Sequence, residues 1–216
     1  MATVTSKDLA RYQTSLDQIA AQPKAKLREL LERLDWEDVT ADANKAVEIM
    51  RAVCQVGTDL SAVSSANFYQ FVRRLSLNEE FTALAMSGFD PAATEGAVRY
   101  FVTSVLKDDQ AMFVSKCLDR YDYEVRLAAR KCTQANANRD TAMAGYALVP
   151  EPGACEFCEY LASLGFIENW TDGDVEIHEH CRCTTVPGFE GKTEIEGYEP
   201  SEIEVTDGEL YDDIPF

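Results

Sequence analysis

The chain has 216 residues, of which 46% are hydrophobic and 10% aromatic, and this composition excludes a disordered or fibrous protein. No apolar run approaches the roughly 18 residues that a membrane span needs, and residues 1–6 lead into charged helical sequence instead of the apolar stretch of a signal peptide. We therefore expect a soluble protein, made in a cytoplasm, that has no membrane partner.

The net charge of −18 is concentrated in the last third of the chain. Residues 1–150 hold 20 acidic and 18 basic side chains, whereas residues 151–216 hold 18 acidic and 2 basic side chains. An acidic segment repels the phosphates of nucleic acids, whose sequence-independent binding depends on clustered lysine and arginine. Direct binding to nucleic acid is therefore not expected.

Apolar residues from position 7 to about 132 recur at the spacing of an α-helix. The first stripe consists of Leu27, Leu30, Leu31 and Leu34. Pro23 precedes it at a place where the first turn of a helix tolerates proline. Further stripes lie in residues 46–54, 60–75, 98–106 and 114–128, with an interruption expected at Gly57. The pattern predicts a body of five to seven helices over residues 1–148.

Two polar features of this body have alternative interpretations. Tyr69 and Arg73 stand one helical turn apart, and we expect core packing with a solvated arginine; a contact face is the alternative. The one sizeable basic run consists of Arg126, Arg130, Lys131 and Arg139. A solvated helix face is the default interpretation of such a run, and contact with an acidic partner or nucleic acid is the alternative.

Two prolines and a glycine in residues 149–153 cannot continue a helix, so we place a boundary there. Beyond it, residues 159–164 form a short helical candidate, and residues 174–177 and 184–186 resemble a pair of strands. Residues 187–216 contain ten acids and one lysine. The predicted fold is mainly α: a multi-helix body, a small zinc-stabilised α+β module over residues 149–186, and an acidic extended tail over residues 187–216.

The seven cysteines are an odd number in a chain without a secretion signal, which favours reduced thiols over disulfides. Three of them, Cys54, Cys117 and Cys132, lie singly in helical sequence, where cysteine is typically a small buried apolar residue. The other four lie within residues 155–183, beside both histidines of the chain. This clustering indicates a metal site.

Zinc prefers four thiolate or imidazole ligands in a tetrahedron, and Cys-x2-Cys places two thiolates on one ion through a tight turn. Cys155 and Cys158 form that half-site, and His178-x2-Cys181-x-Cys183 follows after 19 intervening residues. We expect four ligands from these five residues, with His180 outside the first coordination shell. Sequence spacing leaves open which four they are.

A thiolate-rich shell leaves no open position for water, so we expect a structural zinc ion rather than a catalytic one. Residues 151–186 carry eight acids against one arginine, too polar a composition to fold by apolar burial alone. Zinc binding contributes on the order of 10 kcal/mol to such a module. Leu161, Leu164, Phe166 and Trp170 are expected to pack around the site or against the helical body. Reduced thiols in a small core, or a Cys/His nucleophilic pair, are the alternatives.

Three segments resemble the C-terminal module of minor head proteins of tailed bacteriophages, the MuF-like head-morphogenesis family, in its actinobacteriophage branch. They are residues 147–150 (ALVP), residues 153–165 (GACEFCEYLASLG) and His178-x2-Cys181-Arg182-Cys183-Thr184. Residues 53–73 are similar to the second helical region of that branch. Leu164 stands where a basic residue often precedes the glycine, and the acidic tail has no counterpart in the family pattern.

The resemblance implies a non-enzymatic minor structural protein of the phage head. Such a protein joins the particle with or near the portal, contacts the portal or the major capsid protein, is present in several copies, and is located in the virion. The runner-up is a zinc-dependent nuclease of the HNH or treble-clef kind, which would need an open metal site, a histidine base and a basic groove. A third interpretation is a host-directed effector, packaged in the head, that uses its acidic tail as a DNA mimic.

Overall fold

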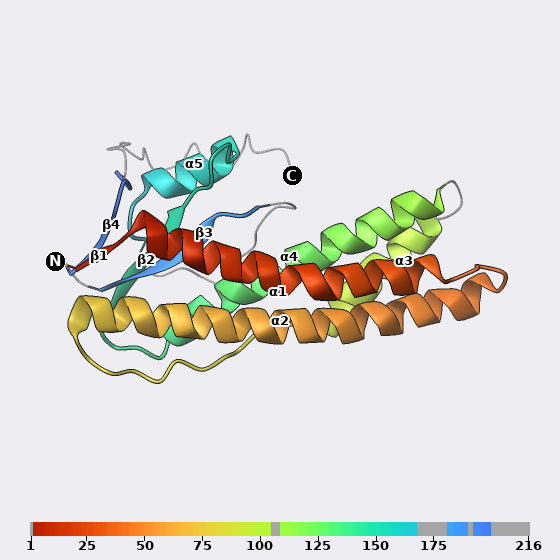
Figure 1. The fold of residues 1–216 in the computed structure, drawn as a ribbon, viewed down its shortest axis with the longest axis horizontal. Helices are drawn as coiled ribbons and strands as arrows, with labels where there is room; N and C mark the ends of the chain where they lie inside the picture. Colours follow the sequence, from red (N-terminus) through yellow and green to blue (C-terminus); the bar gives the residue numbers. More distant parts are fainter. Residues whose placement is uncertain (1, 105–108, 168–180, 190–191, 200–216) are drawn as a thin grey trace, which may run out of the picture.

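The computed structural model describes residues 2–104, 109–167, 181–189 and 192–199 of the chain. Four long helices lie side by side along the longest axis of the molecule, and the short strands and the fifth helix gather at the end where the chain begins (Figure 1). The helices are α1 (Ser6–Glu32), α2 (Val39–Leu77), α3 (Pro91–Ser104), α4 (Gln110–Ala137) and α5 (Glu156–Ser163). The mainly helical fold class is therefore confirmed.

Helix α1 begins with a capping box, in which the Thr5 side chain accepts from the Asp8 N–H and the Asp8 carboxylate accepts from the Thr5 N–H. Pro23 lies inside this helix, not in its first turn. The prediction for Pro23 was therefore wrong. Buried leucines on either side of the proline, Leu16 and Leu27, hold the helix against its neighbours across this position.

Helix α2 runs for 39 residues between the Asp38 cap, whose carboxylate accepts from Thr40 and Ala41, and Asn78 in the left-handed region at φ 56°. Gly57 does not interrupt it, and the Tyr121 ring of α4 packs against this glycine. Among the described residues the predicted body therefore holds four helices, fewer than the five to seven expected.

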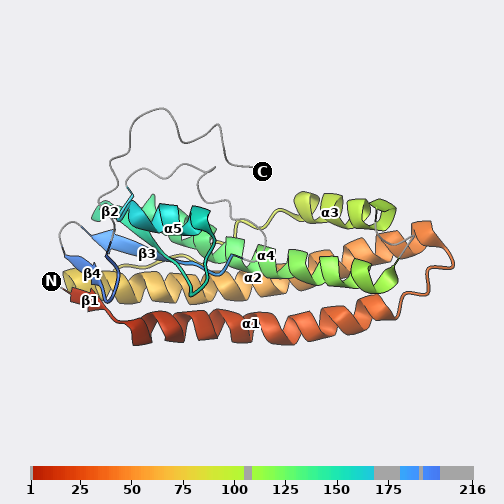
Figure 2. The same cartoon turned by 90° about the horizontal axis from the view of Figure 1, so that it is seen from above.

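Two pairs of strands lie against the start of α1 and the end of α2 (Figure 2). We call this the proximal end of the bundle. β1 (Ala2–Val4) pairs in parallel with β4 (Thr193–Ile195), and β2 (Met143–Val149) pairs antiparallel with β3 (Thr184–Phe189). β3 contains the strand predicted at 184–186, but its partner is β2, which was not predicted. The other strand candidate, 174–177, lies outside the described residues. β4 falls in the segment predicted to be an extended tail.

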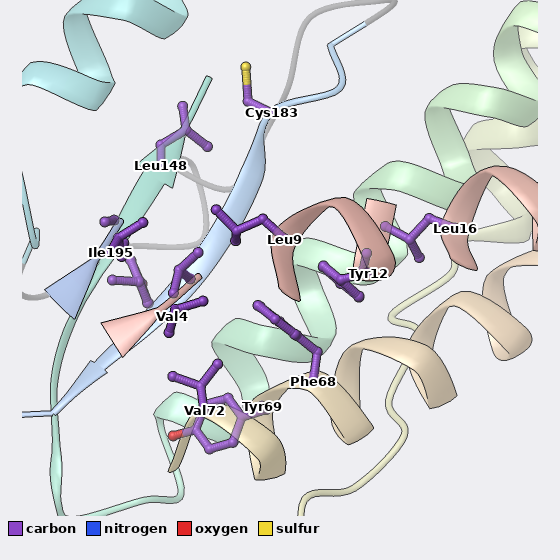
Figure 3. Close-up of a cluster of buried hydrophobic side chains, with 14 of the residues drawn as sticks. Val4, Leu9, Tyr12, Leu16, Phe68, Tyr69, Val72, Leu148, Cys183 and Ile195 are labelled. Atoms are coloured by element: carbon purple, nitrogen blue, oxygen red, sulfur yellow. The ribbon is translucent and has the colours of Figure 1, made fainter. Parts of the chain in front are cut away.

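Buried apolar side chains form two main cores along the bundle. The distal core joins the far halves of the helices, with Met50, Cys54, Cys117 and Tyr121 fully buried. The proximal core combines residues from β1, α1, α2, β2 and β3, and Figure 3 shows Leu9, Tyr12 and Phe68 at its centre and Cys183 at its edge. Three cysteines of the predicted module, Cys158, Cys181 and Cys183, thus share a core with the helical body.

Tyr69 and Arg73 are both buried, which corrects the expectation of a solvated arginine. The Arg73 Nε atom lies 2.6 Å from an Asp140 carboxylate oxygen, and the Tyr69 hydroxyl donates to the same oxygen at 3.2 Å. Arg73 also donates to the Glu80 carbonyl in the 78–90 connection. This cluster ties the ends of α2 and α4 to that connection.

The basic run is solvated only in part: Arg139 is exposed and Arg126 and Lys131 are half-buried, whereas Arg130 is buried. Arg126 pairs with Asp17, Lys131 donates to the Gly88 carbonyl and Arg139 to the Asn136 side chain. Arg130 is buried beside the cysteine cluster described below. In the described part of the chain, no helix combines the length and the apolar character required to cross a membrane.

Candidate metal centre

Three cysteines from distant parts of the chain meet at the edge of the proximal core. Cys158 lies in α5, and Cys181 and Cys183 directly precede β3. Their sulfur atoms all lie within 4.8 Å of one another, and the residues are only 2%, 5% and 8% exposed. The pairing of β2 with β3 brings residues 181–183 back to α5, because β2 leads through residues 150–155 into that helix.

The spacing of the sulfur atoms matches a shared metal ion and not a disulfide. The Sγ atoms of Cys158 and Cys181 are 3.5 Å apart, and none of the seven cysteines is disulfide-bonded. Two thiolates on a tetrahedral zinc ion, each at about 2.3 Å from the metal, stand about 3.8 Å apart. A disulfide would bring the sulfurs to about 2 Å. The three residues therefore fit zinc with little adjustment.

A fourth ligand is needed to close a zinc site, and the candidates are Cys155 and His178. Cys155 is exposed at the N-cap of α5, one turn before Cys158, and is not among the three cysteines whose sulfurs all lie within 4.8 Å of one another. His178 and His180 lie outside the described residues, as does Trp170. The choice of the fourth ligand therefore stays a prediction.

A buried arginine completes the surroundings of the cluster. Arg130 of α4, which is 5% exposed, donates from Nη2 to the Cys181 sulfur at 3.0 Å and to the Cys183 carbonyl oxygen at 3.4 Å. Sequence reasoning did not find this residue. Its position within a basic run suggested solvent exposure, and its partners stand more than fifty positions later in the chain.

The three thiols have different acidities. Hydrogen bonds from Cys158 and Cys183, with the adjacent Arg130 guanidinium, hold the pKa of Cys181 far below its ordinary value against the opposing effect of burial. Hydrogen bonds with the other two sulfurs, together with burial, raise the pKa of Cys158. The cluster thus favours a thiolate at Cys181, and the thiolate is the form of cysteine that binds metal.

The remaining cysteines behave as the sequence predicted. Cys54, Cys117 and Cys132 are fully buried, and burial raises the pKa of Cys117 to about 12. Burial raises the pKa of Cys54 and Cys132 as well. A thiol of this kind stays protonated and packs as a small apolar side chain.

Two of the four apolar residues expected around the site pack on neighbouring parts of the structure. Leu161 of α5 packs against the proximal core, and Phe166 lies against Gly188 of β3 although its side chain is 37% exposed. A Cβ atom on Gly188 would come within 2.2 Å of the Phe166 ring. The glycine therefore allows the segment after α5 to pack on β3.

A cleft of about 460 Å³ lies beside the cluster, between α1 and α4, and Cys181 and Arg182 line one of its walls. Its basic side chains face carboxylates: Arg126 and Arg182 contact Asp17, and Lys24 contacts Asp122. Acidic and basic side chains are therefore about equal in number among the described residues that line the cleft. It lacks the excess of positive charge that binds a nucleic-acid backbone.

The model of a family described as VG15 protein matches residues 3–206. No curated protein and no solved structure matches the chain significantly.

Proposed function

The chain belongs to the VG15 protein family, a family of phage gene products, and we propose that it is a non-enzymatic minor head protein with a structural zinc ion. The family match covers nearly the whole chain and supports a phage origin. The assignment to the head depends on the resemblance of residues 147–165 and 178–184 to MuF-like head-morphogenesis proteins.

The buried cysteine cluster is the observation that carries the non-enzymatic part of this proposal. Cys158, Cys181 and Cys183 are each less than 10% exposed, and their sulfurs converge on one point. A zinc ion there would be bound by Cys158, Cys181, Cys183 and a fourth ligand. It would cross-link α5 to the segment that leads into β3. Catalytic zinc usually keeps an open position for water, which a buried thiolate shell does not provide.

The zinc ion would also stabilise the proximal core. The cysteines pack with residues of β1, α1 and α2, so an ion at this point joins segments from both ends of the described chain. A nuclease of the HNH or treble-clef kind is a weaker candidate, because the cleft beside the cluster has no excess of basic groups among the described residues.

We propose that the partners are the portal or major capsid protein, and that the acidic tail makes part of the contact. Because β4 pairs with β1 and the Tyr198 hydroxyl donates to the Ala162 carbonyl, a tail deletion should begin after residue 199. A deletion from residue 190, in contrast, would remove β4 and disturb the proximal core.

The test is to locate the protein in purified particles of the phage that encodes it. Quantitative mass spectrometry should find the chain in a fixed ratio to the portal subunits, and the 200–216 deletion should lower that ratio while zinc content and helicity persist. Absence of the chain from washed particles would overturn the head assignment. Full incorporation of the deletion variant would instead assign the contacts to the helical body.

A further inference from the structure

Arg130 is a buried cation without a carboxylate partner in the part of the chain that the structure describes. The neighbouring basic residues of α4 have other partners. Arg126, one turn before Arg130, pairs with Asp17, and Lys131 donates to the Gly88 carbonyl. The contacts of the Arg130 guanidinium are the Cys181 sulfur at 3.0 Å and the Cys183 carbonyl at 3.4 Å. The position is 5% exposed, so water contributes little to its solvation.

A guanidinium group stays protonated in proteins, so burial of Arg130 requires a compensating negative charge nearby. A zinc site can supply that charge. Four thiolates around Zn²⁺ give a net charge of −2, and three thiolates with a neutral histidine give −1, whichever fourth ligand the site takes. In both cases the metal-bound cluster retains an excess negative charge in a buried place, and Arg130 is the cation in contact with it.

We infer that Arg130 is a positioning residue of the metal centre: it balances the excess charge of the zinc-bound thiolates and holds residues 181–183 against α4. This inference rests on the proposed zinc site. Groups that hydrogen-bond to metal ligands are a general determinant of affinity, and their loss typically weakens metal binding by 10–100-fold. Zinc affinity should therefore depend on a helix that contributes no ligand.

The experiment compares the full-length wild type with Arg130→Met, Arg130→Lys and Arg126→Gln. Zinc affinity is measured by competition with a chromophoric chelator, and unfolding is measured with zinc and with excess chelator. Arg126 is the matched control, since it lies one turn away on the same helix and has its own counter-ion, Asp17. Its replacement removes a contact between α1 and α4 but no contact to a sulfur.

Arg130→Met should weaken zinc binding by about 10–100-fold. Arg130→Lys, which keeps the charge but lacks the planar donor group, should fall between Arg130→Met and the wild type. Arg126→Gln should bind zinc within about twofold of the wild type. Arg130→Met should also lose stability in zinc but not in chelator, because the methionine removes a buried charge that the metal-free cluster compensates less well.

Three results would overturn the inference, and they are distinguishable. Equal zinc affinity of the wild type and both Arg130 variants would overturn it and leave the zinc site intact, as would an equal loss of stability with and without zinc. A wild type that binds no zinc would overturn the metal centre and this inference together. If Arg130→Met does not fold, the lysine variant decides through its affinity alone.

Discussion

Gly57 of α2 lies directly against the phenol ring of Tyr121 in α4, and a Cβ atom at Gly57 would come within 2.5 Å of the Tyr121 hydroxyl oxygen. Tyr121 is fully buried and cannot swing aside. The absence of a side chain at one position therefore lets the two longest helices approach each other in the distal core.

Gly57→Ala should destabilise the protein by about 1–3 kcal/mol, because overpacking of a rigid core outweighs the gain of up to about 1 kcal/mol in helix propensity. Gly96 of α3 is the matched control, since no heavy atom lies within 4 Å of its added Cβ. Gly96→Ala should stabilise the protein by up to about 1 kcal/mol. Urea unfolding measures both, and equal effects of the two substitutions would contradict this account of Gly57.

The buried pair of Arg73 and Asp140 gives a second prediction. Asp140→Ala leaves the Arg73 guanidinium buried without its nearest carboxylate, which should destabilise the protein by about 3–5 kcal/mol. Glu79 also lies 3.5 Å from Arg73, but its side chain is 65% exposed. Glu79→Gln should therefore change the free energy of unfolding by less than about 1 kcal/mol. A mild effect of Asp140→Ala would show that the pair contributes little.

Alkaline pH should destabilise the protein through Tyr12, whose ring stacks on Phe68 with centroids 4.2 Å apart. Burial raises the pKa of Tyr12 from 10.0 to about 12. Because the folded-state pKa is the higher one, the contribution is complete below pH 10 and is lost as the pH rises from 10 to about 12. The loss should reach about 3 kcal/mol.

The measurement for Tyr12 is the free energy of unfolding in urea at several pH values between 9 and 12, compared with Tyr12→Phe. The phenylalanine variant keeps the aromatic stack but cannot ionise, so its stability should fall less steeply. Tyr198 and Cys117 also titrate in this range, but they are common to both proteins. Parallel curves for the two proteins would show that Tyr12 is not responsible.

Hydrophobic spacing predicted that the body is helical but not the number of its helices. Buried residues such as Met50 and Val72 of α2 and Val125 of α4 recur at helical spacing. It did not predict β2. Residues 145–148 are all buried, so they form a short apolar run without the alternation of a half-exposed strand. β1 and β4 are three residues each, too short to give any periodicity.

The candidate site was predictable only in part. Ligand spacing identified Cys158, Cys181 and Cys183, since the chemistry of zinc fixes which residues recur and how closely. Arg130 could not be found in the same way. Its role follows from α4 lying behind residues 181–183, a tertiary contact that leaves no periodic or spaced pattern in the sequence.

The non-enzymatic proposal predicts that the protein does not cut DNA. Single- and double-stranded DNA incubated with the protein and Mg²⁺, Mn²⁺ or Zn²⁺ should show no more cleavage than with the Cys155→Ser variant. In the cleft beside Cys181, both Arg126 and Arg182 pair with Asp17, so phosphate binding there should be weak. Cleavage that is abolished by His180→Ala, with the zinc content unchanged, would favour the nuclease instead.

The last prediction concerns the metal itself. The purified wild type should contain about one zinc ion per chain, because three convergent sulfurs and one further ligand complete a single tetrahedral site. Cys158→Ser should lose the metal, and so should Cys155→Ser if Cys155 is the fourth ligand. Cys117→Ser is the control: it also replaces a buried cysteine, but in the distal core, and should keep its zinc.

Zinc loss should unfold more than α5 and the segment around it. Cys158, Cys181 and Cys183 pack in one core with Leu9, Tyr12 and residues of β2 and β3, so chelation should reduce hydrogen-exchange protection in β1 and the start of α1 as well. The far halves of α1, α2 and α4 should stay protected, because the distal core contains none of the three clustered cysteines. Zinc binding contributes on the order of 10 kcal/mol to sites of this kind, enough to decide whether the proximal core is folded. A metal-free protein with full protection in β2, β3 and α5 would show that apolar packing alone holds this end of the molecule.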